Sequence, residues 1–139
     1  MQVIILIVTA LIVGCSTSQP LKNAYSDYST KANENNILEL APEFFSANIL
    51  EEDYKTLSYM PEFLLFKNAM KKQHSAFEKN DTKKGCLIVN GFNDKNEKVI
   101  FSLEYVKPSE KWLINFIAAI YDEKDFSEKA LCPDEFAAG

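Results

Sequence analysis

The chain has 139 residues and a formal net charge of −5, with 47 % apolar and 25 % charged residues. This composition is typical of a globular domain with one hydrophobic core, and it excludes a disordered chain. Because phosphate binding needs a basic surface, nucleic acid is not expected as a partner. The acidic charge also argues against electrostatic attachment to anionic lipid.

The N-terminal segment is apolar over residues 3–13, with one threonine among these eleven residues. A transmembrane helix needs about 20 apolar residues, so this run fits the hydrophobic region of a signal peptide instead. The run ends in Ile-Val-Gly-Cys at 12–15, which resembles a bacterial lipobox. The resemblance implies that residues 1–14 are a signal peptide removed before Cys15, and that the Cys15 thiol accepts a diacylglyceryl group. Two or more acyl chains give stable membrane anchoring.

Two features bear on this interpretation. No Lys or Arg precedes the apolar run, so an ordinary signal peptide with an incidental Cys15 is the alternative. Ser16, and not Asp, follows the cysteine, and this resembles the pattern of lipoproteins exported to the outer membrane. Residues 15–20 are then expected to be a lipidated tether. The expected location is the cell envelope, on the inner leaflet of the outer membrane and facing the periplasm.

The chain has three cysteines. With lipid on Cys15, the remaining Cys86 and Cys132 predict one disulfide in an oxidising compartment. The alternatives are a buried pair of free thiols and a metal site. A metal site is disfavoured because His74 is the only histidine and no C-x-x-C spacing occurs.

The N-terminal half is predicted to be helical. Leu21 begins a run of apolar residues with the spacing of one helix face, and three asparagines at 33, 35 and 36 end it. Pro42 and Pro61 each suit the first turn of a helix. The predicted helical stretches are residues 21–32, 37–41, 42–49 and 61–70. Residues 73–79 fit either a helix tail or an edge strand.

The C-terminal half is predicted to be an antiparallel meander of three strands joined by short turns. The expected strands are residues 86–92, 99–106 and 112–121, followed by a short helix over 123–131 that returns Cys132 toward the sheet. Side chains alternate across a strand. The set expected to pack against the helices is Val99, Phe101, Leu103, Tyr105, Trp112, Ile114, Phe116, Ala118 and Ile120. The opposite, mixed face is expected to carry Ile100, Ser102, Glu104, Val106, Leu113, Asn115, Ile117 and Tyr121.

The mixed face is too apolar for a face that meets only solvent. We therefore expect another envelope protein or a second copy of the chain to cover it, through Leu113, Ile117 and Tyr121. The lipid on Cys15 is the expected contact with the membrane.

Helices followed by a curved antiparallel sheet resemble the NTF2-like, or cystatin-like, cone folds. The resemblance is carried by residues 21–42, 85–91, 101–106 and 109–114, and it covers about residues 21–121. It implies an α+β class, with N-terminal helices packed on a curved antiparallel sheet in a single domain over residues 21–139. It implies no activity, because this fold hosts enzymes, binding modules and scaffolds.

The sequence shows no recognisable set of catalytic residues. Enzymes on this fold resemble each other in a His–Asp pair inside the cone, but His74 has polar sequence neighbours and is interpreted as a surface residue. No phosphate-binding loop or nucleophile elbow is present, and no cofactor or metal is expected. Asn90, Glu104 and Asn115 lie mid-strand among apolar residues, where they line a pocket or act as satisfied polar groups of the sheet face.

The expected function is that of a non-enzymatic, membrane-anchored envelope lipoprotein that binds another protein or acts as an accessory module. One alternative is a small-ligand binder or weak enzyme that uses the interior of the cone. Another is a periplasmic immunity lipoprotein against a secreted toxin.

Overall fold

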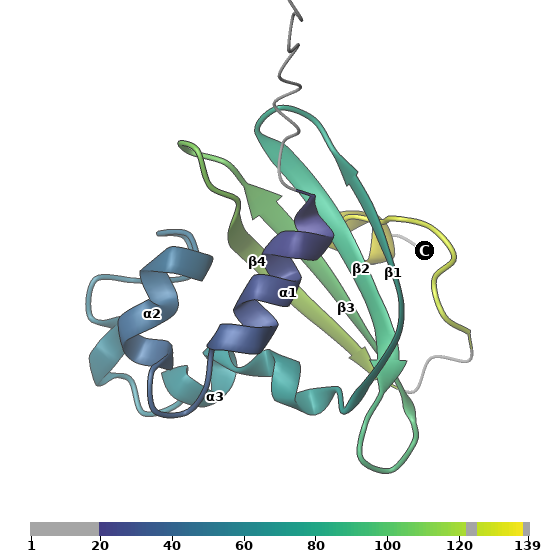
Figure 1. Cartoon of the computed structure of the whole chain (residues 1–139), viewed down its shortest axis with the longest axis horizontal. Helices are drawn as coiled ribbons and strands as arrows, with labels where there is room; N and C mark the ends of the chain where they lie inside the picture. The colour runs from purple at the N-terminus through teal and green to yellow at the C-terminus, as the bar shows by residue number, and fades with distance from the viewer. Residues whose placement is uncertain (1–19, 122–124, 138–139) are drawn as a thin grey trace, which may run out of the picture.

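The computed structural model describes residues 20–121 and 125–137. Helices precede an antiparallel sheet with strand order β1-β2-β3-β4 (Figure 1). The elements are α1 Leu21–Lys31, α2 Ile37–Phe44, η1 Tyr54–Thr56, α3 Met60–Leu64, η2 Phe66–Ala69, β1 Lys72–Asn80, β2 Lys84–Phe92, β3 Lys98–Val106, β4 Leu113–Tyr121 and α4 Pro133–Ala137. The α+β class, with N-terminal helices packed on a four-stranded antiparallel sheet, is confirmed.

Helix α1 lies across one face of the sheet (Figure 1). Leu21 and Tyr28 are buried on its inner side, as the apolar spacing predicts. At the other end of the helix, Lys67 from η2 donates hydrogen bonds to the carbonyl oxygens of Ser29 and Ala32. A cation at this position satisfies terminal carbonyl groups and meets the negative end of the helix dipole. Burial lowers the pKa of Lys67.

Helix α2 differs from the prediction, because residues 37–41 and Pro42 belong to one helix, Ile37–Phe44. A proline inside a helix has no N–H to donate, so the carbonyl oxygen of Leu38, four residues earlier, loses its helical partner. Tyr54 Oη donates a hydrogen bond of 2.8 Å to this oxygen. The helix therefore continues through the proline because a side chain from η1 replaces the missing donor.

The segment between α2 and the sheet is less helical than predicted. Helix α3 ends at Leu64, and a separate 3-10 turn, η2, lies in the rest of the predicted helix 61–70. Residues 73–79 belong to β1, which is an edge strand of the sheet. Beside it, a Cβ added at Gly91 of β2 would lie 2.3 Å from the Met70 sulfur. Only glycine lets the chain leaving η2 approach β2 this closely.

The hydrophobic core lies between the helices and one face of the sheet. Large side chains from both layers fill it, including Leu21, Tyr28, Phe45, Leu64, Phe101, Leu103 and Tyr105. A cavity of about 20 Å³ lies beside Tyr105 and Trp112, which is room for about one water molecule. This space is far too small for a small-molecule ligand.

Strand β4 contains a β-bulge. Tyr105 of β3 pairs with Ile114, but the preceding Glu104 pairs with Phe116, so Asn115 has no partner residue in β3. One extra residue in a strand moves every later side chain to the opposite face of the sheet.

The bulge corrects the predicted faces of the last strand. Ile117 lies opposite Leu103 and packs against the core under the helices, and Tyr121 shares its face. Leu113 lies opposite Val106 on the other face. Leu113, Ile117 and Tyr121 therefore do not form one surface, and the prediction that they do is wrong. The residues predicted to face the helices that instead alternate to the other face are Phe116, Ala118 and Ile120.

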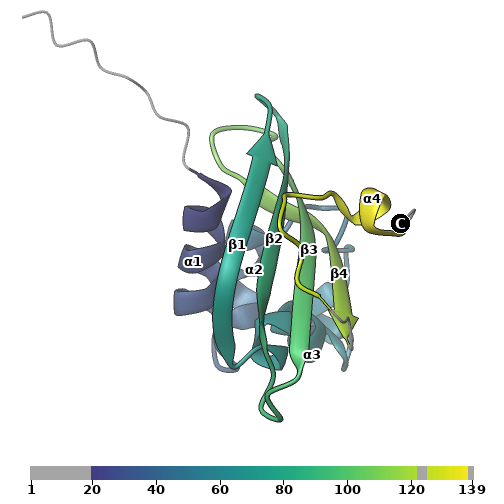
Figure 2. The ribbon, with the colours of Figure 1, turned by 90° about the vertical axis from the view of Figure 1, so that its right-hand side faces the viewer.

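The C-terminal segment, residues 125–137, lies on the sheet face opposite α1 (Figure 2). The helix predicted over 123–131 is not formed within 125–131, and residues 122–124 lie outside the described residues. A helix forms later, at α4, because Pro133 suits a first helical turn. Ile88, Ile100 and Ser102 of the covered face are all buried. Part of the face expected to meet a partner is thus covered by the chain itself.

Candidate functional site

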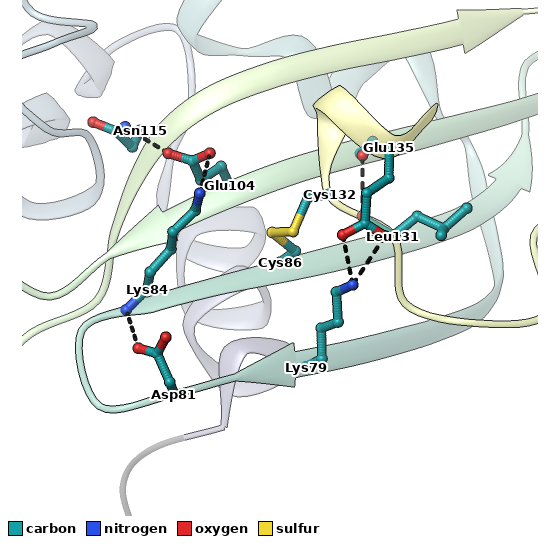
Figure 3. Close-up of a disulfide and its surroundings, with 10 residues drawn as sticks. Lys79, Asp81, Lys84, Cys86, Glu104, Asn115, Leu131, Cys132 and Glu135 are labelled. Carbon is teal, nitrogen blue, oxygen red and sulfur yellow. Dashed lines mark hydrogen bonds and ion pairs between the residues drawn. A yellow bond between two sulfur atoms is a disulfide. The ribbon is translucent and has the colours of Figure 1, made fainter. Parts of the chain in front are cut away.

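Cys86 of β2 and Cys132 form a disulfide with Cα atoms 5.0 Å apart (Figure 3), the pairing that the cysteine count predicts. It links residues 46 positions apart in the chain. Lys79 Nζ of β1 adds a second tie, because it lies 2.6 and 2.9 Å from the two carboxylate oxygens of Glu135. Together these contacts hold the C-terminal segment on the sheet.

Asn90 lies beneath the C-terminal segment. Its side chain is fully buried, and its Nδ2 donates hydrogen bonds of 3.0 Å to Ser75 Oγ and 2.8 Å to the Ser127 carbonyl oxygen. Ser102 Oγ similarly donates to the Leu131 carbonyl oxygen at 3.3 Å. The covered polar side chains therefore fix the path of the C-terminal segment, and Asn90 does not join Glu104 and Asn115 in a pocket.

Glu104 and Asn115 are brought together by the bulge of β4. Asn115 Nδ2 donates a hydrogen bond of 2.9 Å to Glu104 Oε1, and Asn115 Oδ1 accepts one of 2.7 Å from Ser46 Oγ. Lys84 Nζ lies 3.4 Å from Glu104 Oε2 (Figure 3). This chain of polar contacts ties the loop after α2 to β4, β3 and β2. It is a structural network that satisfies the extra residue of the bulge.

His74 stands apart from any acidic partner among its described contacts. Its ring is exposed and stacks on Phe126 of the C-terminal segment, with centroids 4.8 Å apart. Ligand atoms of Cys132, Asp134 and Glu135 gather within 4.8 Å of one another. The sulfur of that group is used in the disulfide and Glu135 pairs with Lys79, so we assign no metal to them.

A groove runs between β4 and the segment that contains α3 and η2. Its larger part has a volume of about 960 Å³. The residues that line this part are Glu34, Ser58, Pro61, Glu62, Phe63, Leu65, Phe66, Asn68, Ala69, Ile117, Ala119 and Tyr121. The side chains from β4 alternate along the strand, so they are the set that the bulge turns toward the helices.

A second, adjoining part of the groove has a volume of about 390 Å³. The residues that line it are Asn48, Ile49, Glu51, Tyr59, Met60, Phe63, Asn115, Phe116 and Ile117. Phe63 and Ile117 line both parts and therefore join them. We call the two parts together the β4 groove.

The β4 groove gathers the exposed apolar surface of the molecule. Among the described residues four large apolar residues are exposed, namely Tyr59, Phe63, Phe116 and Tyr121, and each is 43–59 % accessible. All four line the groove. The charged residues among its lining, Glu34, Glu51 and Glu62, are all acidic. An apolar patch with a polar rim is typical of a protein-binding site.

Sequence reasoning found part of this site. The sequence predicts Ile117 and Tyr121 at a partner surface, and both line the β4 groove. They do so on the helix side of the sheet, because the bulge moves them from the opposite face. Tyr59, Phe63 and Phe116 were missed. Phe63 has the spacing of a core residue in a predicted helix, but within α3 the buried residues are Met60 and Leu64, and Phe63 is exposed.

Cys15, the predicted signal peptide of residues 1–14 and residues 15–19 of the predicted tether lie outside the described residues. Within the described part of the chain, no helix has the length and apolar character needed to cross a membrane. Comparison of the chain with protein-family models, curated proteins and solved structures finds no match.

Proposed function

We propose that this protein is a lipid-anchored accessory lipoprotein of the bacterial cell envelope that binds another protein through the β4 groove and catalyses no reaction. The observation that carries the proposal is the gathering of Tyr59, Phe63, Phe116 and Tyr121 in one groove. Exposed aromatic side chains are costly in water and are enriched at the centres of protein interfaces. The filled interior supports binding at the surface over uptake of a ligand into the cone.

The proposed anchor is lipid on Cys15, and the proposed location is the inner leaflet of the outer membrane. The lipobox-like residues 12–15 and Ser16 support both. The disulfide between Cys86 and Cys132 supports an oxidising compartment. The finer fold assignment is also a proposal. We propose an NTF2-like, or cystatin-like, cone, supported by helices that come first in the chain and by α1 lying across the sheet.

Photo-crosslinking in intact cells tests the binding function. Full-length protein is made with p-benzoylphenylalanine in place of Phe63 or Tyr121, which line the groove, or of Asn23, which is exposed on α1. We expect a discrete adduct of higher mass from the two groove positions and none from position 23. No adduct from the groove positions, or the same adducts from all three, would contradict the proposal.

A further inference from the structure

We propose that the partner of the β4 groove is an extended polypeptide segment, rich in apolar and basic side chains, which pairs with the outer edge of β4 as a fifth strand. This inference rests on the proposed function and specifies the chemistry of the partner. Three independent features support it: the unpaired edge, the groove beside that edge and the charge around the groove.

The outer edge of β4 is open over most of its length. Near its start, the loop after α2 covers it, because Phe45 forms a bridge with Ile114 and Ser46 N–H donates to the Ile114 carbonyl oxygen at 2.9 Å. Beyond this point, over residues 116–121, no described residue pairs with the outer edge. Six residues match the usual length of a strand, about 5–6 residues. The edge can therefore accept one more strand through backbone hydrogen bonds.

The two edges of the sheet differ in how they are protected against pairing. Strand β1, at one edge, carries Lys72, Glu78 and Lys79 and has a register shift between Gln73 and Ser75. Charges and irregularities of this kind keep an edge strand from pairing with other chains. Strand β4 has the sequence LINFIAAIY, without a charged residue, and its bulge at Asn115 precedes the open stretch 116–121. The sequence therefore protects one edge and leaves the other available.

The groove gives such a strand a place for its side chains. Side chains of an added strand alternate between the two faces of the sheet. Those on the helix side enter the β4 groove, where Phe63 and Ile117 form the apolar floor shared by both of its parts. Tyr121 and Phe116, which are 55 % and 52 % exposed, flank the added strand. Backbone bonds would thus supply affinity, and the groove would select apolar side chains.

Charge selects the polar part of the partner. The three charged lining residues, Glu34, Glu51 and Glu62, attract Lys or Arg side chains. A second copy of this chain is disfavoured as the occupant, because its own β4 has no basic residue and each copy carries a net charge of −5. The edge is thus suited to a basic, extended segment from a different protein.

Three synthetic ten-residue peptides test the inference against the full-length protein with its disulfide intact. The first alternates Val, Phe and Ile with Lys, the second has Glu in place of every Lys, and the third repeats the first with alternate backbone amides methylated. We expect the first to bind and to slow hydrogen exchange of the free β4 amides within residues 116–121. The acidic and methylated peptides should bind at least about tenfold more weakly. Added salt should weaken binding of the Lys peptide.

Matched variants locate the binding. Tyr121→Lys places a positive charge at the groove and should lower the affinity for the Lys peptide about tenfold or more. Gln73→Lys places the same charge on the other edge strand and should leave binding unchanged. Equal binding of the methylated peptide, protection of β1 in place of β4, or absence of binding up to about 1 mM Lys peptide would each overturn the inference. So would a concentration-dependent dimer that Ala119→Lys abolishes, because it would assign the edge to a second copy.

The outcomes separate this inference from the proposed function. If positions 63 and 121 crosslink to a protein in cells but no peptide adds to β4, the fifth strand is wrong and binding by the groove stands. If the Lys peptide adds to β4 but no crosslink forms in cells, the edge chemistry is right and the proposed cellular role is wrong.

Discussion

Tyr28 Oη donates a buried hydrogen bond of 2.6 Å to the carbonyl oxygen of Leu64. The bond joins α1 to the end of α3, and the Tyr28 ring stacks on Phe66 with centroids 5.2 Å apart. Because Phe63 lies one residue before Leu64, this contact helps to fix the position of Phe63, which lines both parts of the β4 groove.

We predict that Tyr28→Phe lowers the free energy of unfolding by about 1–3 kcal/mol, because the buried Leu64 carbonyl oxygen is left without its donor. Urea denaturation measures the loss. Tyr105→Phe is the matched control, since Tyr105 is equally buried but its hydroxyl has no hydrogen-bond partner among the described residues. It should change stability by less than about 0.5 kcal/mol or increase it. Equal losses in both variants would show that the Tyr28 bond contributes nothing.

The disulfide is predicted to be a major source of stability. Replacing both Cys86 and Cys132 with Ala should lower the free energy of unfolding by up to about 4 kcal/mol, from the entropy of the closed loop. Denaturant midpoints with and without a dithiol reductant measure the effect. Reductant should shift the wild-type midpoint and leave the double variant unchanged. Two reactive thiols in the exported, untreated protein would refute the pairing.

A pH dependence is predicted at the turn between β1 and β2. The backbone N–H groups of Lys83 and Lys84 donate hydrogen bonds of 2.9 Å each to Asp81 Oδ1, and these bonds lower the pKa of the Asp81 carboxyl. A lowered pKa in the folded state contributes stability that is present above the unfolded value, about 3.9, and is lost as pH falls through the folded value. Asp81→Ala should therefore be less stable than wild type at neutral pH.

The difference in stability between Asp81→Ala and wild type should decrease as pH falls below the ordinary pKa of an aspartate. Thermal denaturation from neutral to acid pH measures it. Asp94→Ala, which removes a carboxylate from the turn between β2 and β3, controls for the change in net charge. A gap that stays constant with pH would mean that the loss comes from turn geometry and not from the charge of Asp81.

The lipid anchor is predicted to depend on Cys15 alone. Cells grown with radiolabelled palmitate should label the wild-type protein, and Cys15→Ala should abolish both the label and the association with the membrane fraction. Cys86→Ala should remain labelled. No label in the wild type would leave the alternative of an ordinary signal peptide, and label in the Cys15→Ala variant would place the lipid on another residue.

Helices and strands whose apolar residues recur with a regular helix or strand period are predictable from the sequence. Helix α1 follows the 3.6 period, and Val99, Phe101, Leu103 and Tyr105 of β3 are the inner side chains that the 2.0 period predicts. The class of the fold follows from their order. Cys86 and Cys132 are a predictable pair because only two cysteines remain once one is set aside.

The remaining features depend on contacts between distant residues. The bulge at Asn115 is stabilised by Ser46 and Glu104, and nothing in the local pattern of β4 marks an extra residue. Pro42 stays inside α2 because of Tyr54, from another element. The C-terminal segment is held by a disulfide and by polar side chains of the sheet, so its own helical pattern did not decide its conformation. The β4 groove was predicted only in part, because the bulge at Asn115 decides which side chains of β4 face it.

The direction of α1 sets the reach of the protein. The helix has 11 residues, so it is about 16 Å long. The helix begins at Leu21, and Glu34, which lines the groove, follows Lys31 at the other end of the helix. In the proposed anchored protein the six residues 15–20 span at most about 20 Å, so the start of α1 stays close to the bilayer. Because Glu34 lies beyond the other end of α1, about the length of the helix then separates this part of the β4 groove from the anchored end.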